Sequence, residues 1–403
     1  MPCSSFTNQN MNILQVSPYN IFPKNTGGDE RTQGIAYPLA EDHHVIRYCT
    51  NGILTKLYEQ WGSDSISLDY KLEMNGVTEY QPNSLLLDLP NVIGYLSMSQ
   101  FGKFISSKIL NMRIPSDLDS LCRWADVTII ERPWFVKTIS NDYDTHVIYS
   151  SHDVVSDLYD SVLGDFPLRD AFLKSVKNIE EEALTSADHL ICVSEEDVVR
   201  YHEKYSIEIP SLSIPNSVSQ ERFAEKEYVT NDPNHAVFLG ANRKPNQNAV
   251  KKIIESTQIV RETHPRFKTS IVGSVSNHFA DLDMDCINLV GYVEDLGDTL
   301  SKFDIALNPV TEGGGSSVKM IDYCSSGLPI VTSEFGSRGF GFKDREHVLI
   351  SETDTTQFAD AIRTLLDNDD LRRKIQQNSQ EFACKNYTWE GYKDDLLDIL
   401  PDI

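Results

Sequence analysis

The sequence predicts an α/β protein with two domains, each built on a doubly wound, mostly parallel sheet. Its 403 residues, of which 40% are hydrophobic, suffice for two domains of ordinary size with a core each. Along most of the chain, short apolar segments typical of buried strands alternate with segments whose apolar residues recur at helical spacing. A charged, polar segment at 225–235 separates two such series and is expected to be a linker.

The first domain is expected to span residues 1–224. Residues 1–10 are polar and show no periodicity, which predicts a disordered leader. Short runs rich in Ile, Val and Leu predict the strands, and longer amphipathic runs predict the helices. The expected strands are 11–17, 45–48, 127–131, 146–150 and 190–193, and the expected helices are 30–39 and 171–184.

The second domain is expected to span residues 236–385, where the same alternation begins again. The expected strands are 236–239, 269–272, 305–307 and 328–332, and the expected helices are 248–262, 355–366 and 371–385. A last helix at 389–400 belongs to the tail 386–403, which we expect to cross back to the first domain.

The most informative segment is the run Thr-Glu-Gly-Gly-Gly-Ser-Ser-Val-Lys-Met-Ile-Asp-Tyr at 311–323. A glycine-rich turn that opens into a helix points backbone N–H groups at one spot, which predicts an anion site. The residues expected to line it are Gly314, Gly315, Ser316 and Ser317. Lys319 and Asp322 lie three positions apart on one helical face, a pair that suits a diphosphate and a ribose. Gly336 belongs to a second flexible turn after strand 328–332.

This block resembles the donor-binding segment of family 4 glycosyltransferases. The resemblance implies the GT-B fold, two Rossmann-like domains that face each other across a cleft. It also implies transfer of a sugar from a nucleotide diphosphate sugar to a glycan or lipid-linked acceptor, with retention of anomeric configuration. Many members carry two glutamates separated by seven residues. Here Asp322 stands at the second position and Gly314 at the first, so the ribose-binding acid is kept and the acid that touches the sugar is absent.

Residues of the first domain also fit the resemblance. Gly27 and Gly28 follow the first strand and precede a helix, so backbone can approach an acceptor or a diphosphate there. Arg31 stands where the family often has a basic residue. His152 follows strand 146–150, and the resemblance implies a contact with the donor sugar; alternatively this histidine caps a loop. The segment 131–134 either lines the acceptor pocket or carries a surface ion pair.

The expected chemistry uses His152, Lys319 and Asp322 as the catalytic set. Arg243 or Lys244, after the first strand of the second domain, is expected to reach the donor phosphates. The chain has no Asp-x-Asp motif and no histidine cluster, which predicts a metal-independent reaction without a cofactor beyond the donor. Two alternatives stay open, a nucleotide-sugar epimerase of the same fold and a catalytically decayed nucleotide-binding protein.

The charge and the cysteine content restrict the partners and the cellular compartment that we expect. The formal net charge of −24 disfavours nucleic acid as a partner, because neutralising phosphates needs a basic face. The acidity indicates either a well-solvated surface or adaptation to a salty cytoplasm. The 7 cysteines are scattered and odd in number, which favours a reducing cytoplasm over a disulfide framework or a zinc site. No apolar run reaches the length of a membrane span, and no signal peptide is evident.

One segment favours contact with a membrane surface. Residues 89–116 contain no acidic residue, and aromatic and aliphatic residues recur at helical spacing beside three basic ones. We expect this segment either to dock peripherally on the inner face of a membrane or to pack as an ordinary helix into the first domain's core.

Overall fold

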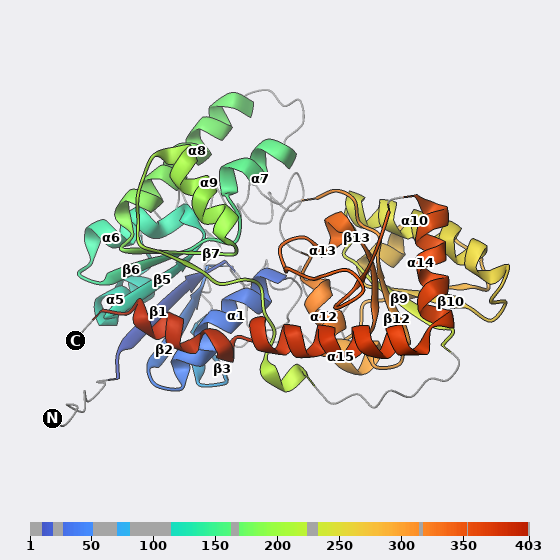
Figure 1. The fold of residues 1–403 in the computed structure, drawn as a ribbon. Coiled ribbons are helices and arrows are strands. Elements are labelled where there is room, and N and C mark those ends of the chain that lie inside the picture. The colour runs from blue at the N-terminus through green and yellow to red at the C-terminus, as the bar shows by residue number, and fades with distance from the viewer. Residues whose placement is uncertain are drawn as a thin grey trace. The chain divides into compact units, whose positions relative to one another are not determined.

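The computed structural model describes residues 10–18, 27–50, 71–80, 114–162, 169–223, 233–313, 317–352 and 354–401. The chain separates into two compact units. Unit 1 comprises Met1–Pro215 together with Tyr392–Ile403, and unit 2 comprises Asn216–Gly391. Each unit is a sheet covered by helices, so the predicted α/β architecture with two doubly wound domains is confirmed (Figure 1).

The sheet of unit 1 has eight strands among the described residues, in the order β3-β4-β2-β1-β5-β6-β7-β8. All neighbours are parallel except β3 and β4. The strands are β1 (Asn12–Ser17), β2 (His44–Cys49), β3 (Lys71–Met74), β4 (Val77–Tyr80), β5 (Val127–Glu131), β6 (His146–Ser150), β7 (His189–Cys192) and β8 (Ser211–Ser213). The order reverses at β1, which lies between β2 and β5.

Apart from the C-terminal one, the helices that the structure describes in unit 1 lie in the connections between these strands. They are α1 (Gly27–Ala40), α5 (Ser116–Trp124), α6 (Val136–Asp142), α7 (Val155–Val162), α8 (Arg169–Ser186), α9 (Glu195–Tyr205) and α16 (Lys393–Asp398). Leu14 and Val16 of β1 lie in one large apolar cluster. The residue between them, Gln15, points to the opposite face, where it is fully buried and donates to the Thr32 carbonyl of α1 at 2.9 Å. The face of the sheet toward α1 therefore contains buried polar groups.

The sheet of unit 2 has six parallel strands among the described residues, in the order β11-β10-β9-β12-β13-β14. The strands are β9 (His235–Leu239), β10 (Lys268–Val272), β11 (Ile287–Gly291), β12 (Ile305–Asn308), β13 (Ile330–Ser333) and β14 (Leu349–Ser351). Val237 and Phe238, successive residues of β9, belong to two different apolar clusters. Both faces of this sheet are therefore buried, as expected where parallel strands read as continuous apolar runs.

The structure describes six α-helices in unit 2, of which α10, α14 and α15 are long and amphipathic. They are α10 (Lys244–Arg261), α11 (Leu296–Leu300), α12 (Lys319–Ser325), α13 (Glu334–Ser337), α14 (Thr355–Asp367) and α15 (Asp369–Asn386). Figure 1 shows α10 and α14 side by side, and Ile253 of α10 and Ile362 of α14 share one apolar cluster. The glycine-rich segment enters α12 directly, because Lys319 is the first residue of that helix.

The end of the chain returns to unit 1. After α15, the chain passes through Glu390–Tyr392 into α16, which packs on α1. Leu396 of α16 is 1% exposed, and Lys393 Nζ lies 2.6 Å from Glu41 Oε2 and 2.7 Å from Asp42 Oδ2. The tail is therefore part of the first unit's fold.

Several expectations concern residues outside the described ranges. They include all but the last residue of the leader 1–10, most of the linker 225–235, and the segment 89–116 except for its last three residues. Ser116, the last of these, begins α5. Among the helices that the structure describes, none combines the length and the apolar character needed to cross a bilayer.

Candidate functional site

In unit 2 the candidate site lies where the strand order of the sheet reverses. β9 is the first strand of the unit, and its neighbours are β10 on one side and β12 on the other. In open α/β sheets the connections that leave such a pair of strands turn to opposite faces and leave a crevice at the carboxyl ends. The segment after β9 contains Arg243 and Lys244, and the segment after β12 contains the glycine-rich run. The sequence-predicted donor residues therefore follow the two strands at the reversal.

Lys319, which follows β12, contacts β9 and the segment that follows β9. Its Nζ donates to Asn246 Oδ1 at 2.9 Å and lies 4.2 Å from the centroid of the Phe238 ring. Phe238 is on β9, Asn246 is in the first turn of α10, and Lys319 begins α12. Sequence reasoning found the lysine but neither of its partners, because an Asn and a Phe carry no signal of this role in the sequence.

The environment of the Lys319 amine disfavours its charge. Burial lowers the pKa of Lys319 to about 7, and the charge of Asp322 offsets only part of this effect. The Phe238 ring and the Asn246 amide oxygen both attract an ammonium group. Together they replace only part of the water that would surround it in solution, so the charged form remains disfavoured. An anion placed beside this amine would restore the charged form, which is the behaviour expected of a phosphate-binding lysine.

Asp322, the expected ribose acid, is held by an arginine that sequence reasoning did not single out. Its side chain is 11% exposed, and its Oδ1 accepts a hydrogen bond from Arg222 Nη2 at 2.8 Å. Arg222 ends a single 3₁₀ turn, Gln220–Arg222. The next residue of α12, Tyr323, is fully buried and accepts from the backbone N–H of Leu239 at 2.7 Å. These contacts fix the rotation of α12 relative to β9.

The glycine-rich run itself is described only in part. Gly314, Gly315 and Ser316 lie outside the described residues, whereas the Ser317 hydroxyl lies 3.4 Å from Asn308 Nδ2. Asn308, the last residue of β12, is fully buried and also donates to the carbonyl of Gly336 at 3.0 Å. Its Oδ1 finds no hydrogen-bond partner among the residues that the structure describes.

The expectation that Gly336 lies in a flexible turn is wrong. Gly336 is a buried residue of α13, whose first turn is capped by the Ser333 hydroxyl accepting from the Gly336 N–H at 3.0 Å. A short capped helix follows β13 here because Ser333 supplies the N-cap and Gly336 leaves space against Thr332 and Asn308.

Arg243 and Lys244 start α10. Arg243 is the N-cap residue and Lys244 the first residue of the helix, and both are exposed. Their charges stand at the positive end of an 18-residue helix, so together they raise the electrostatic potential near the end of β9.

In unit 1 the candidate residues lie at the carboxyl ends of β5 and β6. Glu131, the last residue of β5, is paired in register with Ser150, the last residue of β6. His152 Nε2 lies 2.7 Å from Glu131 Oε2, and the two side chains are 6% and 0% exposed. The other carboxylate oxygen of Glu131 accepts from Gln15 Nε2 at 2.6 Å. The expected site residue His152 is thus held by a buried carboxylate.

The pKa values of this pair keep the histidine neutral. Burial, opposed by the hydrogen bond to Glu131, lowers the pKa of His152 to about 4. Burial alone would raise the pKa of Glu131, but the hydrogen bond from His152 and the charge of Arg31 bring it below its ordinary value. At neutral pH the pair is therefore a carboxylate next to an uncharged imidazole.

The backbone between these residues is strained. Arg132, which follows Glu131, has a φ of 82° with a ψ of 157°. A non-glycine residue in this region costs on the order of 1–3 kcal/mol, and such strain clusters at functional sites. Arg132 Nη1 lies 3.1 Å from Asp153 Oδ2, and the Arg132 N–H donates to the Ser150 carbonyl at 3.0 Å. Neighbouring strand ends are thus tied together twice.

The remaining expected residues of unit 1 occupy the start of α1. Gly27 and Gly28 are the first two residues of that helix rather than of a loop before it. Arg31 is 1% exposed and donates to the carbonyls of Ile214 at 2.7 Å and Cys192 at 3.1 Å. Its guanidinium therefore holds two backbone segments of this unit.

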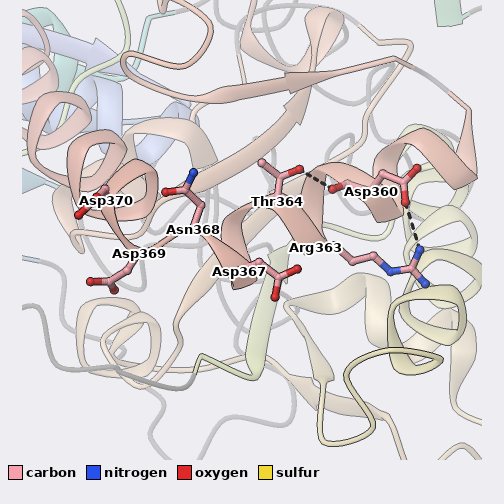
Figure 2. A pocket seen from close by; sticks show the side chains of 7 residues that line it. All are labelled: Asp360, Arg363, Thr364, Asp367, Asn368, Asp369 and Asp370. Atoms are coloured by element: carbon pink, nitrogen blue, oxygen red, sulfur yellow. Dashed lines mark hydrogen bonds and ion pairs between the residues drawn. The ribbon is translucent and has the colours of Figure 1, made fainter.

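A separate hollow opens on the surface of unit 2 between the end of α14 and the start of α15 (Figure 2). It is lined by Asp360, Arg363, Thr364, Asp367, Asn368, Asp369 and Asp370. Arg363 contacts Asp360 at 3.1 Å, and Asp369 pairs with Arg372 at 2.7 Å. The first pair is partly exposed and the second joins an exposed acid to a buried arginine, and the hollow contains none of the expected site residues. Among the residues that the structure describes, no three His, Cys, Asp or Glu side chains come together as metal ligands would.

Comparisons with known proteins agree with the fold. Residues 233–368 match the family model described as Glycosyl transferases group 1. The segment includes Phe238, Asn246 and Lys319. No curated protein matches the sequence.

Of three solved structures with a similar fold, two match over nearly the whole chain and the third matches over part of it. A sucrose-phosphate synthase from Thermosynechococcus elongatus is 14% identical with a TM-score of 0.71, covering 97% of this chain and 98% of its own. An E. coli structure described as trehalose-6-phosphate bound with UDP-2-fluoro glucose is 13% identical with a TM-score of 0.65, covering 97% and 99%. A mutant of S. aureus TarM in complex with UDP and other ligands is 19% identical with a TM-score of 0.52, covering 70% and 58%. The expected GT-B fold is confirmed by these structures, and residues 233–368 are similar to the glycosyl transferases group 1 family, as the resemblance implied.

Proposed function

We propose that this protein is a retaining glycosyltransferase that moves a sugar from a nucleotide diphosphate sugar to a glycan or lipid-linked acceptor. The observation that carries the proposal is the contact of Lys319 with Asn246 and Phe238 at the strand-order reversal of unit 2, inside the matched family segment. Two of the similar proteins named above are bound with UDP-2-fluoro glucose or UDP, which supports a nucleotide-linked donor. None of the three is described as an epimerase, and their descriptions give that alternative no support.

Each candidate site residue takes one role in the proposed reaction. Lys319, with Arg243 or Lys244, neutralises the departing diphosphate, and charge-assisted hydrogen bonds of this kind contribute about 1.5–3 kcal/mol each. Asp322, oriented by Arg222, accepts from the ribose hydroxyls. His152 contacts the transferred sugar, as the family resemblance implies. Gly27 and Gly28 let backbone approach the acceptor or the diphosphate. No metal is required in this scheme, because protein cations balance the leaving charge.

A panel of nucleotide diphosphate sugars tests the proposal. Calorimetry identifies the donors that bind saturably, and nucleotide release is then measured with and without candidate acceptors. A transferase releases nucleotide faster with an acceptor, an epimerase interconverts the donor without one, and a decayed protein binds without turnover. Proton NMR of the product reports whether the anomeric configuration is retained, and turnover that persists in a chelator supports metal independence.

A matched pair of variants locates the donor site. Lys319→Met should lower kcat at least about tenfold while the protein stays folded, because one cation next to the leaving group is lost. Lys251→Met removes an exposed lysine of α10 and should leave kcat unchanged. Equal kinetics in both variants would remove the donor-site assignment.

A further inference from the structure

We infer that Glu131 is a positioning residue that fixes the ring orientation and the tautomer of His152. The inference deepens the proposed function, because it states how His152 is prepared to meet the sugar, and it rests on that function for its kinetic part. Its structural part concerns only atoms of unit 1 and stands independently of turnover.

The hydrogen bonds around Glu131 have a fixed direction. Gln15 Nε2 faces two acceptors, the Thr32 carbonyl at 2.9 Å and Glu131 Oε1 at 2.6 Å. Its Oε1 accepts from Arg47 Nε at 2.8 Å. The Gln15 amide therefore cannot be reversed without placing like groups together, and it always presents a donor to Glu131.

The chemistry of the pair then determines the tautomer. An ionised carboxylate only accepts hydrogen bonds, so the 2.7 Å contact between Glu131 Oε2 and His152 Nε2 requires a hydrogen on Nε2. The imidazole is uncharged at neutral pH, so Nδ1 has no hydrogen and can only accept. In this tautomer Nδ1 is the accepting nitrogen of the ring, and its place is set by the carboxylate, as in other sites where a carboxylate orients a histidine.

The scaffold supports this arrangement. Glu131 and Ser150 are register partners at the ends of β5 and β6, so the two side chains start from adjacent points of one rigid sheet. The strained backbone of Arg132 and its ion pair with Asp153 hold the residues that follow. Backbone strain of this kind persists only where many surrounding contacts hold the residue in place. Such residues cluster at functional sites, which supports a functional role for this segment.

Glu131→Gln tests the inference without changing the size of the side chain. Gln15 still presents its donor, so the new amide must turn its oxygen toward Gln15 and its NH₂ toward His152. His152 Nε2 then has to accept, and the hydrogen moves to Nδ1. The variant is therefore expected to reverse the tautomer of His152 while the fold is kept.

The readout is the ¹⁵N spectrum of selectively histidine-labelled full-length protein at pH 7, in which a ring nitrogen without hydrogen resonates far downfield of one that carries hydrogen. The His152 signals are assigned by their loss in His152→Asn. The wild type should show the Nε2–H tautomer and Glu131→Gln the Nδ1–H tautomer. A charged ring, or an Nδ1–H tautomer in the wild type, would overturn the inference, as would an unchanged tautomer in Glu131→Gln.

Glu180→Gln is the matched control. Glu180 is likewise 0% exposed in unit 1 and accepts from the Val155 N–H at 2.6 Å and the Tyr201 hydroxyl at 3.0 Å. Its hydrogen-bond partners among the described residues are Val155, Ser156, Tyr201 and Tyr205 and do not include His152, so its variant tests the loss of a buried carboxylate that does not touch the ring. It should leave the His152 tautomer unchanged even if the protein becomes less stable.

Kinetics separate positioning from structure. With a donor and acceptor found as described above, Glu131→Gln should lower kcat by about tenfold to a hundredfold with donor KM nearly unchanged, because a hydrogen-bond acceptor has become a donor. Glu131→Asp, which keeps an acceptor-only group, should retain the Nε2–H tautomer and recover part of the rate. A reversed tautomer with full activity would overturn the positioning role. If the wild type transfers no sugar, the proposed function fails and the tautomer measurement still decides the structural part.

Discussion

At the scale of single residues, Lys319 combines a buried amine with a neutral hydrogen-bond partner. Because burial lowers the pKa of this amine to about 7, a share of these amines is uncharged near neutral pH. A diphosphate next to the amine raises its pKa, so binding must take up protons. We expect up to about half a proton per site at pH 7 when a nucleoside diphosphate binds.

Calorimetry in buffers of different ionisation enthalpy measures that uptake. The observed binding enthalpy should vary with the buffer in the wild type and in Lys251→Met, and the variation should shrink in Lys319→Met. A binding enthalpy that does not depend on the buffer in the wild type would contradict the lowered pKa of Lys319.

The same amine makes stability depend on pH. Unfolded lysine titrates near pH 10.4, so between about pH 7 and about pH 10 the unfolded chain holds a proton that folded Lys319 has lost. The unfolded state binds more protons there, and the free energy of unfolding contributed by Lys319 rises with pH. Urea unfolding at pH 7 and pH 9 should show a smaller increase in Lys319→Met than in the wild type. An equal increase in both proteins would show that Lys319 titrates normally.

Gly336 is a residue whose missing side chain matters. A Cβ there would lie 2.6 Å from Thr332 Oγ1 and 2.7 Å from the Asn308 carbonyl oxygen, and the second of these is backbone that cannot move aside. Gly336→Ala should therefore cost about 1–3 kcal/mol of unfolding free energy in unit 2. Gly297→Ala, whose Cβ would meet nothing closer than 3.6 Å, should change stability by less than about 1 kcal/mol. Equal urea midpoints for the two variants would contradict the close packing at Gly336.

At the scale of elements, the turn of the β3–β4 hairpin could be predicted from its Asn-Gly pair, although the apolar pattern of the two strands does not predict them. Asn75 and Gly76 both have positive φ, 49° and 77°, as a two-residue hairpin turn requires. Asn-Gly between two short alternating segments is the strongest local hairpin signal. Because β3 is mostly exposed, it lacks the apolar run by which the other strands are predicted.

Two variants of α16 compare how much apolar packing and how much surface ion pairs contribute to its docking on α1. Leu396→Ala removes a side chain that is 1% exposed and should cost about 2–5 kcal/mol. Lys393→Ala breaks the contacts with Glu41 and Asp42 but should cost less than about 1 kcal/mol, because exposed ion pairs contribute little. Hydrogen exchange followed by peptide should show faster exchange in α1 only for Leu396→Ala. Faster exchange confined to unit 2 would contradict the assignment of the tail to unit 1.

At the scale of the whole molecule, the net charge of −24 opposes compaction. Salt shortens the Debye length from about 10 Å at 0.1 M to about 3 Å at 1 M, which screens this repulsion. We expect the Tm to rise by several degrees between these concentrations of NaCl, and less so in a variant with Asp360, Asp367 and Asp370 changed to Asn, three acids of the surface hollow in Figure 2. A Tm that falls with salt would contradict a dominant role of repulsion, and loss of activity in molar salt would end the hypothesis of a salty cytoplasm.

The sequence by itself determined the two α/β units, most central strands and the donor segment, because these depend on local periodicity and on residues close together in the chain. Glu131 and His152, Lys319 and Asn246, or Asp322 and Arg222 are 21, 73 and 100 positions apart, so only the tertiary structure could pair them. The structure also decided that Arg31 binds backbone carbonyls inside unit 1 and that Gly336 lies in a capped helix. The physical reason is that periodicity reports which face of an element is buried, whereas the partner on the other side of that face is set by how strands of one sheet are ordered.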